Sequence, residues 1–365
     1  MKTISLFSGC GGMDFGIKAA GCDVVFANDV MKYAAETHRK YFKDTDFIHG
    51  DIREISNFPS TDLVVGGYPC QSFSMGGNRK PENDPRTYLF KEFARAVEAS
   101  NPKFFIAENV SGLKSVQNGQ WLKQQIDVFE DIGNHGYNTS FKIINSQDYG
   151  VPQRRKRLFV IGVRRDLGGY FHFPTETHCK LEDVKKTGLL PHTSHGEVIK
   201  HLPKWPSGEF YERPHDPEGH FSWYYMSRNR KAEWNRPSYT VVANFRHTTL
   251  HPASPTMKLT WSNLADGFKQ RWDFTDHFEH LDHEPEMFKL EEARRLSWRE
   301  AACIQTFPRG FEPAGDLMRK FEQIGNAVPP KLIEVIAHWL KSEQGLKDYA
   351  PTDGVQKKDS QLKLL

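Results

Sequence analysis

The sequence predicts an α/β fold in which a doubly wound, mostly parallel sheet is accompanied by a smaller, irregular domain. Two observations lead to this prediction. From Lys2 to about Val163, short β-rich runs alternate with amphipathic stretches of helix length, as in sheets built from strand–helix–strand units. Between 176 and 285 the alternation is replaced by a segment that contains proline, histidine and tryptophan and has little periodicity. A chain of 365 residues is long enough for both parts.

Each expected strand is a short run of apolar and β-branched residues that ends at a turn. In chain order these runs are Thr3–Phe7, Val24–Ala27, Phe47–His49, Leu63–Val65, Phe104–Ala107, Ser140–Asn145 and Leu158–Gly162. The stretches between them carry apolar residues at helical spacing. They predict helices over Met13–Ala20, Tyr33–Tyr41, Thr87–Ala99 and Gln120–Ile132.

Two further helices are expected near the end of the chain. Ser297 and Glu300 form a capping-box pattern, which predicts that a helix begins at Trp298. Pro330–Lys341 is amphipathic, with its apolar residues on one face. The polar residues 344–365 are expected to form a flexible tail.

Composition excludes several classes of protein. Hydrophobic residues make up 38% and charged residues 26%, which is ordinary for a globular chain and excludes extensive disorder. No apolar run reaches 18 residues and no basic, apolar leader follows Met1, so a cytoplasmic protein without a membrane span is expected. The five cysteines form no C-x-x-C pair, which favours a reducing compartment, and no metal site is predicted. The net charge of +3 is too small to indicate nucleic acid by itself.

A glycine-rich turn at Phe7–Gly12 joins the first strand to the first helix, where free N–H groups suit a nucleotide-like ligand. Asp29 ends the second strand 20 residues after Gly9, the position of a carboxylate that binds ribose hydroxyls. Asp14 stands where a dinucleotide-binding fingerprint needs its third glycine. This argues against the hypothesis of a nicotinamide dehydrogenase and favours a cofactor without phosphate. S-adenosylmethionine fits, with Asp29 on the ribose and Asp51 near the adenine amine. The alternative is a tight turn with two solvated acids.

Cys70 and Glu108 follow neighbouring strands of the expected sheet. The cysteine lies in the loop after Leu63–Val65, and the glutamate follows Phe104–Ala107. The carboxyl ends of parallel strands meet at one edge of a sheet, so both side chains can face one substrate beside the cofactor. Thiolate addition at C6 of cytosine, helped by an acid at N3, makes C5 reactive enough to accept a methyl group. Taken singly, a loop cysteine is most often an inert buried thiol, and a glutamate after a strand is often a helix N-cap partner.

Six segments resemble the DNA cytosine-5 methyltransferases, in that family's order and over nearly everything outside the irregular part. They are Phe7–Gly12, Gly67–Gln71, Glu108–Val110, Gln153–Leu158, Arg294–Leu296 with Gln305–Pro308, and Gln323–Pro329. The resemblance implies a Rossmann-like fold that binds S-adenosylmethionine, duplex DNA as the substrate, and a target-recognition domain over 176–285. It also implies that 286–343 folds back onto 1–175 to complete the catalytic domain.

The resemblance assigns roles to individual residues. Cys70 becomes the nucleophile at C6, and Glu108 the group that holds N3. Arg155 and Arg157 become polar contacts to the flipped cytosine and its surroundings. The S-adenosylmethionine site is expected to be lined by Phe7, Gly9, Gly12, Asp29, Asp51, Ile52, Leu89 and Asn326.

The chain departs from the family pattern at two positions. Tyr68 stands where many members have proline before the Pro-Cys pair. Val30 stands where some members place an aromatic ring over adenine. Neither change removes a reacting group.

Arginines are the expected DNA contacts. Arg154 opens a run of four cations that suits phosphates. Arg228, Arg230 and Arg246 lie in two segments of the irregular part and are candidates for base readout, because arginine can bond guanine O6 and N7 together. The spacing of Arg228 and Arg230 is equally typical of an exposed strand. The segment around Met226–Arg230 resembles that of prokaryotic members that read GGCC, which favours a GC-rich site.

The sequence thus predicts a bacterial, nucleoid-associated methyltransferase of a restriction–modification system. We expect it to act on duplex DNA as a monomer, beside an endonuclease but not in a stable complex with it. Two alternatives stay open: a tRNA cytosine-5 methyltransferase and a non-catalytic DNA-binding protein on the same fold. The length of the irregular part, 176–285, argues against the first, and the presence of both Cys70 and Glu108 argues against the second.

Overall fold

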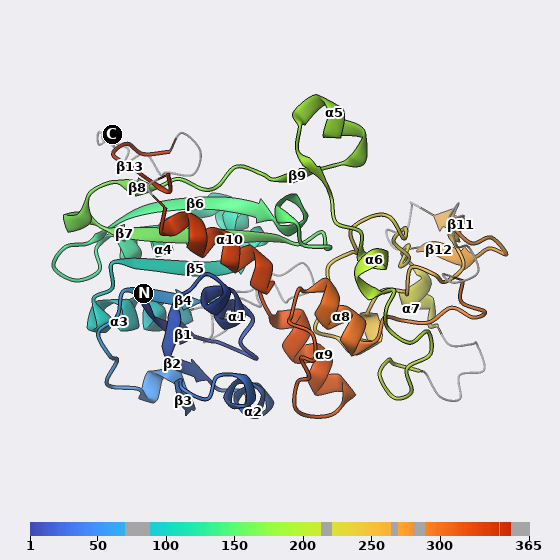
Figure 1. Cartoon of the computed structure of the whole chain (residues 1–365), viewed down its shortest axis with the longest axis horizontal. Helices are drawn as coiled ribbons and strands as arrows, with labels where there is room; N and C mark the ends of the chain where they lie inside the picture. Colours follow the sequence, from blue (N-terminus) through green and yellow to red (C-terminus); the bar gives the residue numbers. More distant parts are fainter. Residues whose placement is uncertain (70–87, 213–220, 264–268, 280–288, 343, 352–365) are drawn as a thin grey trace.

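The computed structural model describes residues 1–69, 88–212, 221–263, 269–279, 289–342 and 344–351. Its centre is a seven-stranded sheet in the order β3-β2-β1-β4-β5-β7-β6, flanked by helices (Figure 1). The predicted α/β class with a mostly parallel sheet is confirmed. The strands are β1 (Lys2–Leu6), β2 (Asp23–Asp29), β3 (Asp46–His49), β4 (Leu63–Gly66), β5 (Phe104–Val110), β6 (Tyr137–Asn145) and β7 (Lys156–Arg164).

Only β7 runs against the other strands of this sheet. It pairs antiparallel with both β5 and β6, whereas β3, β2, β1, β4 and β5 are parallel neighbours. Residues 146–155 between β6 and β7 are too few for a crossover helix, so β7 returns antiparallel. The strand order reverses between β1 and β4, which is where open α/β sheets bind their ligands.

Helices cover both faces of the sheet. Val64 of β4 packs in one core with Phe93, and its neighbour Val65 packs in another with Ile333. Adjacent residues of a strand point to opposite faces, so these two cores lie on opposite sides. The helices around the sheet are α1 (Gly12–Ala19), α2 (Lys32–Tyr41), α3 (Leu89–Ser100), α4 (Gln120–Glu130) and α10 (Pro330–Leu340).

The helices α1 and α10 come from opposite ends of the sequence and lie against each other (Figure 1). Gly16 of α1 permits this close approach. A Cβ on Gly16 would lie 2.4 Å from the carbonyl oxygen of Pro330 and 2.7 Å from the Cβ of Ile333. The last helix therefore packs beside the first one and covers the same face of the sheet.

Replacing Gly16 with alanine is expected to destabilise the protein, although alanine favours a helix over glycine by about 1 kcal/mol. The added methyl group must push α10 away from α1, and such overpacking costs about 1–3 kcal/mol. Gly50→Ala is the matched control, because a Cβ on Gly50 would meet nothing within 4 Å. Thermal unfolding should show a lower melting temperature for Gly16→Ala alone. Equal melting temperatures would contradict the tight helix contact.

Residues 176–285 hold short elements. In Figure 1, α7 and the β11–β12 hairpin lie at the opposite end of the molecule from α3 and α4. This hairpin was not predicted from the sequence, although Met257, Leu259 and Trp261 alternate with polar residues along its first strand. The elements are β9 (His178–Cys179), α5 (Val184–Thr187), β10 (Leu190–Pro191), α6 (His195–Ile199), α7 (Trp223–Met226), β11 (Met257–Asn263) and β12 (Lys269–Phe274).

The structure corrects several expected boundaries. β5 extends to Val110 and β7 begins at Lys156, so Glu108 and Arg157 belong to strands rather than to the loops beside them. The helix α8 (Trp298–Ile304) begins with the predicted capping box, in which both reciprocal hydrogen bonds are present. The structure also contains a helix that was not predicted from the sequence, α9 (Leu317–Asn326). Asp316 caps it, because its carboxylate accepts a hydrogen bond from the backbone N–H of Arg319.

The expected tail is ordered at its beginning. β13 (Leu346–Lys347) pairs antiparallel with β8 (Tyr170–Phe171), so regular structure extends past residue 344. In the described part of the chain, no helix is both long and apolar enough to cross a membrane.

Candidate active site and nucleic-acid interface

The turn after β1 has the backbone of a ligand-binding loop. Phe7, Gly9 and Gly11 adopt positive φ angles of 53°, 56° and 88°. Glycine reaches such angles at little cost, whereas Phe7 is held in a strained conformation. A Cβ on Gly9 would meet nothing within 4 Å, so the backbone there borders open space. Gly12 is packed on its other side, because its Cβ would lie 2.6 Å from the carbonyl oxygen of Val328.

Asp29, the last residue of β2, is tied to this turn. Its carboxylate accepts hydrogen bonds from the backbone N–H of Gly9 at 2.8 Å and of Met31 at 2.7 Å. Burial raises the pKa of this carboxyl, and the two N–H donors oppose the rise. Each carboxylate oxygen can accept a further hydrogen bond, so Asp29 can still bind a hydroxyl group.

The segment after β3 is fastened beside β2. The side-chain amide of Asn28 donates to the carbonyl oxygen of Gly50 at 2.9 Å. The carboxylate of Asp51 is engaged by Arg53, whose Nε and Nη2 lie 3.0 and 2.5 Å from its two oxygens and lower its pKa. The other expected cofactor residues are buried Ile52 in a short 3-10 turn, half-buried Leu89 at the start of α3, and exposed Asn326 at the end of α9.

Glu108 lies in β5 beside the end of β4. A Cβ on Gly67 would lie 2.9 Å from the Oε2 of Glu108, so the loop after β4 passes this carboxylate as closely as glycine permits. Arg157 of β7 also contacts it, with Nε 3.0 Å from Oε1. The strand register explains this pair. Glu108 is opposite Phe159, and Arg157, two residues along β7, projects to the same face.

The surroundings of Glu108 favour its protonated form. Burial raises the pKa of its carboxyl, and the guanidinium groups of Arg157 and Arg155 counteract only part of that rise. A buried acid with a raised pKa keeps its proton to higher pH than a solvated one. Glu108 can therefore donate a hydrogen bond or a proton to a bound base.

Arg155 is only 2% exposed and joins three chain segments. Its Nη1 donates to the carbonyl oxygen of Val241 at 3.2 Å and to that of Gly325 at 3.0 Å. Burial and the nearby charge of Arg157 lower its pKa, and Glu108 opposes this shift. Arg155 thus attaches the loop before β7 to the segment around 241 and to the end of α9.

Sequence reasoning missed the part played by Gln153. Its buried side chain accepts a hydrogen bond from the N–H of Val241 at 2.8 Å and donates to the Oε1 of Gln305 at 2.8 Å. Gln305 in turn donates to the carbonyl oxygen of Ile324 at 2.6 Å. Gln153 thus binds the backbone N–H of Val241, and Arg155 binds its carbonyl oxygen. A single buried amide leaves no periodic signal, so only its place in a matching segment could have pointed to it.

Cys70, the expected nucleophile, lies outside the described residues. The other four cysteines are poorer candidates for this role. Cys10 and Cys22 are buried, and burial raises the pKa of both Cys10 and Cys303, which disfavours the reactive thiolate. Cys179 lies in β9, which pairs with β10 and is not a strand of the seven-stranded sheet.

The two departures from the family pattern have different surroundings. Tyr68 is buried, and its hydroxyl donates to the Oε1 of Gln125 at 2.7 Å. Its ring also packs against Phe93 and Phe129. Tyr68 therefore holds the loop after β4 against α3 and α4. A proline at this position has no side-chain donor and could not make this hydrogen bond. Val30 is 66% exposed.

The run of four cations does not form one basic surface. Arg154 and Lys156 are exposed, whereas Arg155 is buried and Arg157 faces Glu108. The period of two along an extended chain separates the four side chains in this way. Arg154 stacks on an aromatic ring, with its guanidinium carbon 4.6 Å from the ring centre of Tyr239. Of the run, Arg154 and Lys156 remain accessible to phosphates.

The three arginines expected to read bases lie in one cluster. Burial lowers the pKa of His247, and so do the nearby charges of Arg230, Arg295, Arg228 and Arg246. We call these five residues the arginine cluster. Arg228 and Arg246 are exposed and Arg230 is half-buried, whereas Arg295 is buried, so three of the four cations contribute to a positive surface that suits an anionic partner.

The arginine cluster is built on irregular chain and aromatic rings. Residues 227–230 do not form a strand, so the exposed-strand alternative for Arg228 and Arg230 is wrong. Arg230 donates to the carbonyl oxygen of Tyr225 at 3.0 Å and lies 4.9 Å from the centre of its ring. Arg228 and Arg246 are exposed, which leaves their guanidinium groups accessible.

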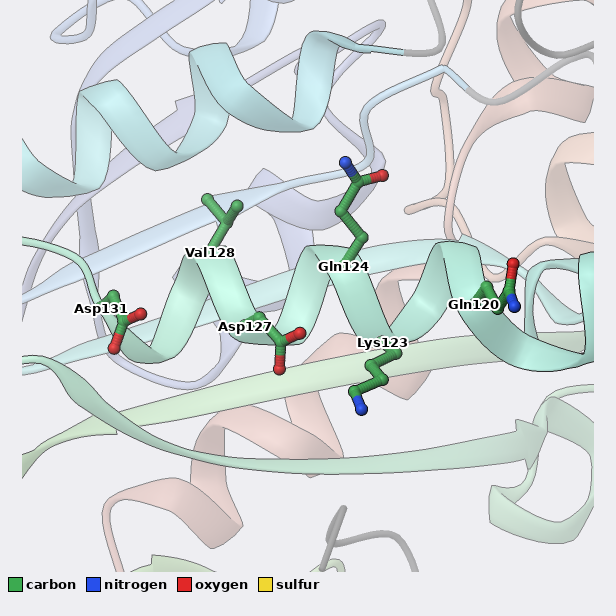
Figure 2. Close-up of a pocket in the computed structure, with 6 residues that line it drawn as sticks. All are labelled: Gln120, Lys123, Gln124, Asp127, Val128 and Asp131. Atoms are coloured by element: carbon green, nitrogen blue, oxygen red, sulfur yellow. The ribbon is translucent and has the colours of Figure 1, made fainter. Parts of the chain in front are cut away.

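A shallow hollow along α4 lies apart from these residues (Figure 2). The side chains around it project from one helix in several directions and do not converge on a common point. They are the mostly exposed Gln120, Lys123, Gln124, Asp127, Val128 and Asp131, which is the composition of a solvated helix face.

The fold and the site together define a class of protein. A mostly parallel sheet places a glycine turn, the carboxylate of Asp29 and the buried carboxyl of Glu108 at one edge, and an arginine cluster lies apart from them. This combination belongs to α/β enzymes that bring a nucleotide-like cofactor to a charged polymer.

Comparison with known proteins narrows this class. The family model described as C-5 cytosine-specific DNA methylase matches residues 1–342. The chain therefore belongs to the C-5 cytosine-specific DNA methylase family and is a DNA (cytosine-5-)-methyltransferase.

Individual relatives agree with this assignment. The chain is 37% identical to the type II methyltransferase M.FnuDI of Fusobacterium nucleatum over 346 residues, covering 93% of this chain and 94% of the relative. It is 36% identical to M.MthTI of Methanothermobacter thermautotrophicus, covering 94% and 98%. The fold matches that of the S. pombe Dnmt2 methyltransferase with a TM-score of 0.57 at 19% identity, covering 93% of this chain and 97% of that one.

Proposed function

We propose that this methyltransferase transfers a methyl group from S-adenosylmethionine to C5 of a cytosine in a specific, GC-rich site of duplex DNA, within a restriction–modification system. The observation that carries the proposal is the position of Glu108. Glu108 lies beside Gly67, and Gly67 precedes Cys70 by three residues in the sequence. A Cβ on Gly67 would also lie 3.5 Å from the side chain of Met13 in α1. The acid, the nucleophile's loop and the cofactor turn thus share one sheet edge. Relatives named as type II methyltransferases support the restriction–modification setting.

The residues around the first turn fit S-adenosylmethionine. Asp29 retains acceptor capacity for ribose hydroxyls, and the open space at Gly9 lets a ligand approach the backbone. Asp14 is buried, with its carboxylate bound by Ser5 at 2.9 Å and by His38 at 3.1 Å. A buried carboxylate at this point opposes a pyrophosphate, which supports a cofactor without phosphate. When bound, S-adenosylmethionine supplies an electrophilic methyl group.

The chain's own residues prepare the cytosine. The base must leave the DNA stack to reach them. The Cys70 thiolate adds to C6 while Glu108 gives its proton to N3, so that C5 gains electron density and accepts the methyl group. Arg157 contacts the Glu108 carboxyl and holds it beside the base. Arg155 binds backbone carbonyls, and its positive charge also acts on Glu108. A base such as water then takes the C5 proton, and the C5–H electron pair re-forms the C5–C6 double bond and expels the Cys70 thiolate. N3 returns its proton to Glu108.

We further propose the division of labour along the chain. Residues 1–175 with 286–343 form the catalytic domain, as the packing of α10 on α1 supports. Residues 176–285 recognise the target, and the arginine cluster supports this role. The enzyme works as a monomer on nucleoid DNA in the cytoplasm, beside an endonuclease.

Bisulfite sequencing of host DNA tests the proposed function directly. Expression of the chain should protect cytosines within one short GC-rich sequence from conversion. Purified protein with S-adenosylmethionine should methylate duplex DNA and leave tRNA unmodified. Methylation of tRNA alone would replace the proposal with the tRNA alternative, and specific DNA binding without methyl transfer would indicate a non-catalytic protein.

Asp29→Ala should weaken S-adenosylmethionine binding by about tenfold to a hundredfold. A hydrogen bond to a charged group is worth about 1.5–3 kcal/mol, and Asp29 offers such bonds to the ribose. Titration calorimetry measures the affinity. Asp23→Ala is the control, since Asp23 begins the same strand with an exposed side chain. Equal affinities of the two variants would remove Asp29 from the cofactor site.

Arg228→Ala or Arg230→Ala should cost about 1–3 kcal/mol of binding on the cognate site and relax discrimination at one base pair. Arg236→Ala serves as the control, because Arg236 is exposed but pairs with Glu182 away from the arginine cluster. Binding to a set of duplexes with single base changes measures both quantities. Uniform weakening on every duplex, with a shallower salt dependence, would assign these arginines to phosphates instead.

A further inference from the structure

The arginine cluster continues into an exposed aromatic surface. Tyr224 is 59% exposed, and its ring centre lies 5.2 Å from that of His247 in the cluster. Trp223, which is 46% exposed, lies 5.9 Å from Trp261 of β11, which is 41% exposed. Arg271 of β12 stands over Trp223, with its guanidinium carbon 5.0 Å from the ring centre. We call Trp223, Tyr224, Trp261 and Arg271 the aromatic surface.

Adjacent exposed tryptophans are a binding signature rather than ordinary surface. Each large ring left in water forgoes the stabilisation that burial would bring, and contiguous exposed apolar groups mark interaction sites. The indole N–H is also a hydrogen-bond donor without an acceptor function, which suits an acceptor-rich partner such as phosphate.

Charge identifies the partner as anionic. Arg271 lies within the aromatic surface, and Lys258 is exposed on the neighbouring strand. Asp273 neutralises part of this charge, because its Oδ1 lies 2.7 Å from the Nε of Arg271. The arginine cluster next to Tyr224 adds the exposed Arg228 and Arg246 and the half-buried Arg230. A surface of rings flanked by cations complements the sugars and phosphates of a nucleic-acid backbone.

We infer that the aromatic surface binds the backbone of duplex DNA beyond the bases that the arginine cluster contacts, and so lengthens the enzyme's footprint on one side of the target. The inference rests on the proposed function and adds a second, sequence-independent contact. The hairpin lies farther from the seven-stranded sheet than α8 does (Figure 1). The added contact therefore falls on DNA that flanks the site on the side away from Glu108.

The test compares duplexes of two lengths, both centred on the site that bisulfite sequencing identifies. The short duplex ends at the site, and the long one extends it by about 10 base pairs, or one helical turn, on each side. The proteins are the full-length wild type, the Trp223→Ala/Trp261→Ala double variant and Arg271→Ala. Trp205→Ala is the matched control, because Trp205 is 45% exposed and packs near Phe210 instead.

The double variant should bind the long duplex about tenfold more weakly than the wild type, a loss of about 1.4 kcal/mol, and bind the short duplex equally well. Arg271→Ala should also reduce the salt dependence on the long duplex by about one phosphate contact, whereas the tryptophan variant should not. Trp205→Ala should match the wild type on both.

Three results would overturn the inference. Unchanged affinity of the double variant for the long duplex removes the contact. An equal loss on both duplexes, with a lowered melting temperature, shows that the tryptophans only pack the hairpin onto α7. Dissociation of a wild-type dimer by the double variant, seen in sedimentation, assigns the surface to a second copy of the chain. Failure of the wild type to methylate or bind any duplex instead overturns the proposed function itself.

Discussion

Cys70→Ser is expected to abolish methyl transfer while leaving binding of the cognate duplex largely intact. The thiolate is the form that attacks C6, and a free cysteine has a pKa of about 8.5, so a useful fraction ionises near neutral pH. A serine hydroxyl is far less acidic and remains protonated. Transfer of labelled methyl groups to duplex DNA measures the loss. Cys303→Ser is the control, because its half-buried thiol has a pKa raised by burial.

The covalent step can be trapped. If Cys70 adds to C6, release after methyl transfer requires loss of the proton on C5, and fluorine at C5 cannot leave in that way. A duplex with 5-fluorocytosine at the target should therefore stay attached to the wild-type protein in the presence of S-adenosylmethionine. Denaturing gels and peptide mass spectrometry should place the adduct on Cys70. An adduct on Cys10, Cys22, Cys179 or Cys303, or methylation of ordinary duplex without any adduct, would show that the nucleophile is misassigned.

Glu108→Ala is expected to slow methyl transfer by about 10²–10⁴-fold, the usual contribution of a positioned acid. Without the carboxyl, N3 has no proton donor when the thiolate adds to C6. Glu108→Gln should lose less, because its amide N–H can still donate a hydrogen bond at the same place. Single-turnover rates at saturating DNA separate this chemical effect from binding. Glu209→Gln is the control, because Glu209 pairs with Arg299 outside the site.

The pH dependence distinguishes these roles. The pKa of Glu108 is raised by burial, so the carboxyl keeps its proton at low pH and loses it as the pH rises through that raised pKa. Wild-type activity should fall on this alkaline side, while ionisation of Cys70 produces the acid side of a bell-shaped profile. Glu108→Gln cannot titrate, so its profile should lose the alkaline fall and keep the acid limb. An unchanged profile in Glu108→Gln would exclude Glu108 as the titrating acid.

Local signals in the sequence determined the elements that position the candidate site. Apolar periodicity and turn residues predicted the strands that became β1 to β7, with boundaries that shifted by a few residues. The capping pattern at Ser297 predicted the start of α8, and the glycines of Phe7–Gly12 predicted a tight turn between β1 and α1, where Gly9 and Gly11 adopt positive φ angles. These signals succeed because helix capping, turn geometry and strand alternation depend on residues that are close in the chain.

Only the tertiary structure decided how distant residues meet. The four cations after Gln153 look alike in the sequence, but the antiparallel register of β5 and β7 turns Arg157 toward Glu108 and leaves Arg154 exposed. The same holds for the arginine cluster, whose members come from three separate segments, and for Gly16, whose need for glycine arises from a helix more than 300 residues away. Strand register and helix packing depend on complementary surfaces brought together by folding. No local pattern in the sequence encodes register or helix packing. The candidate reacting groups can therefore be predicted from the sequence, but only the packed structure shows which of them face one another.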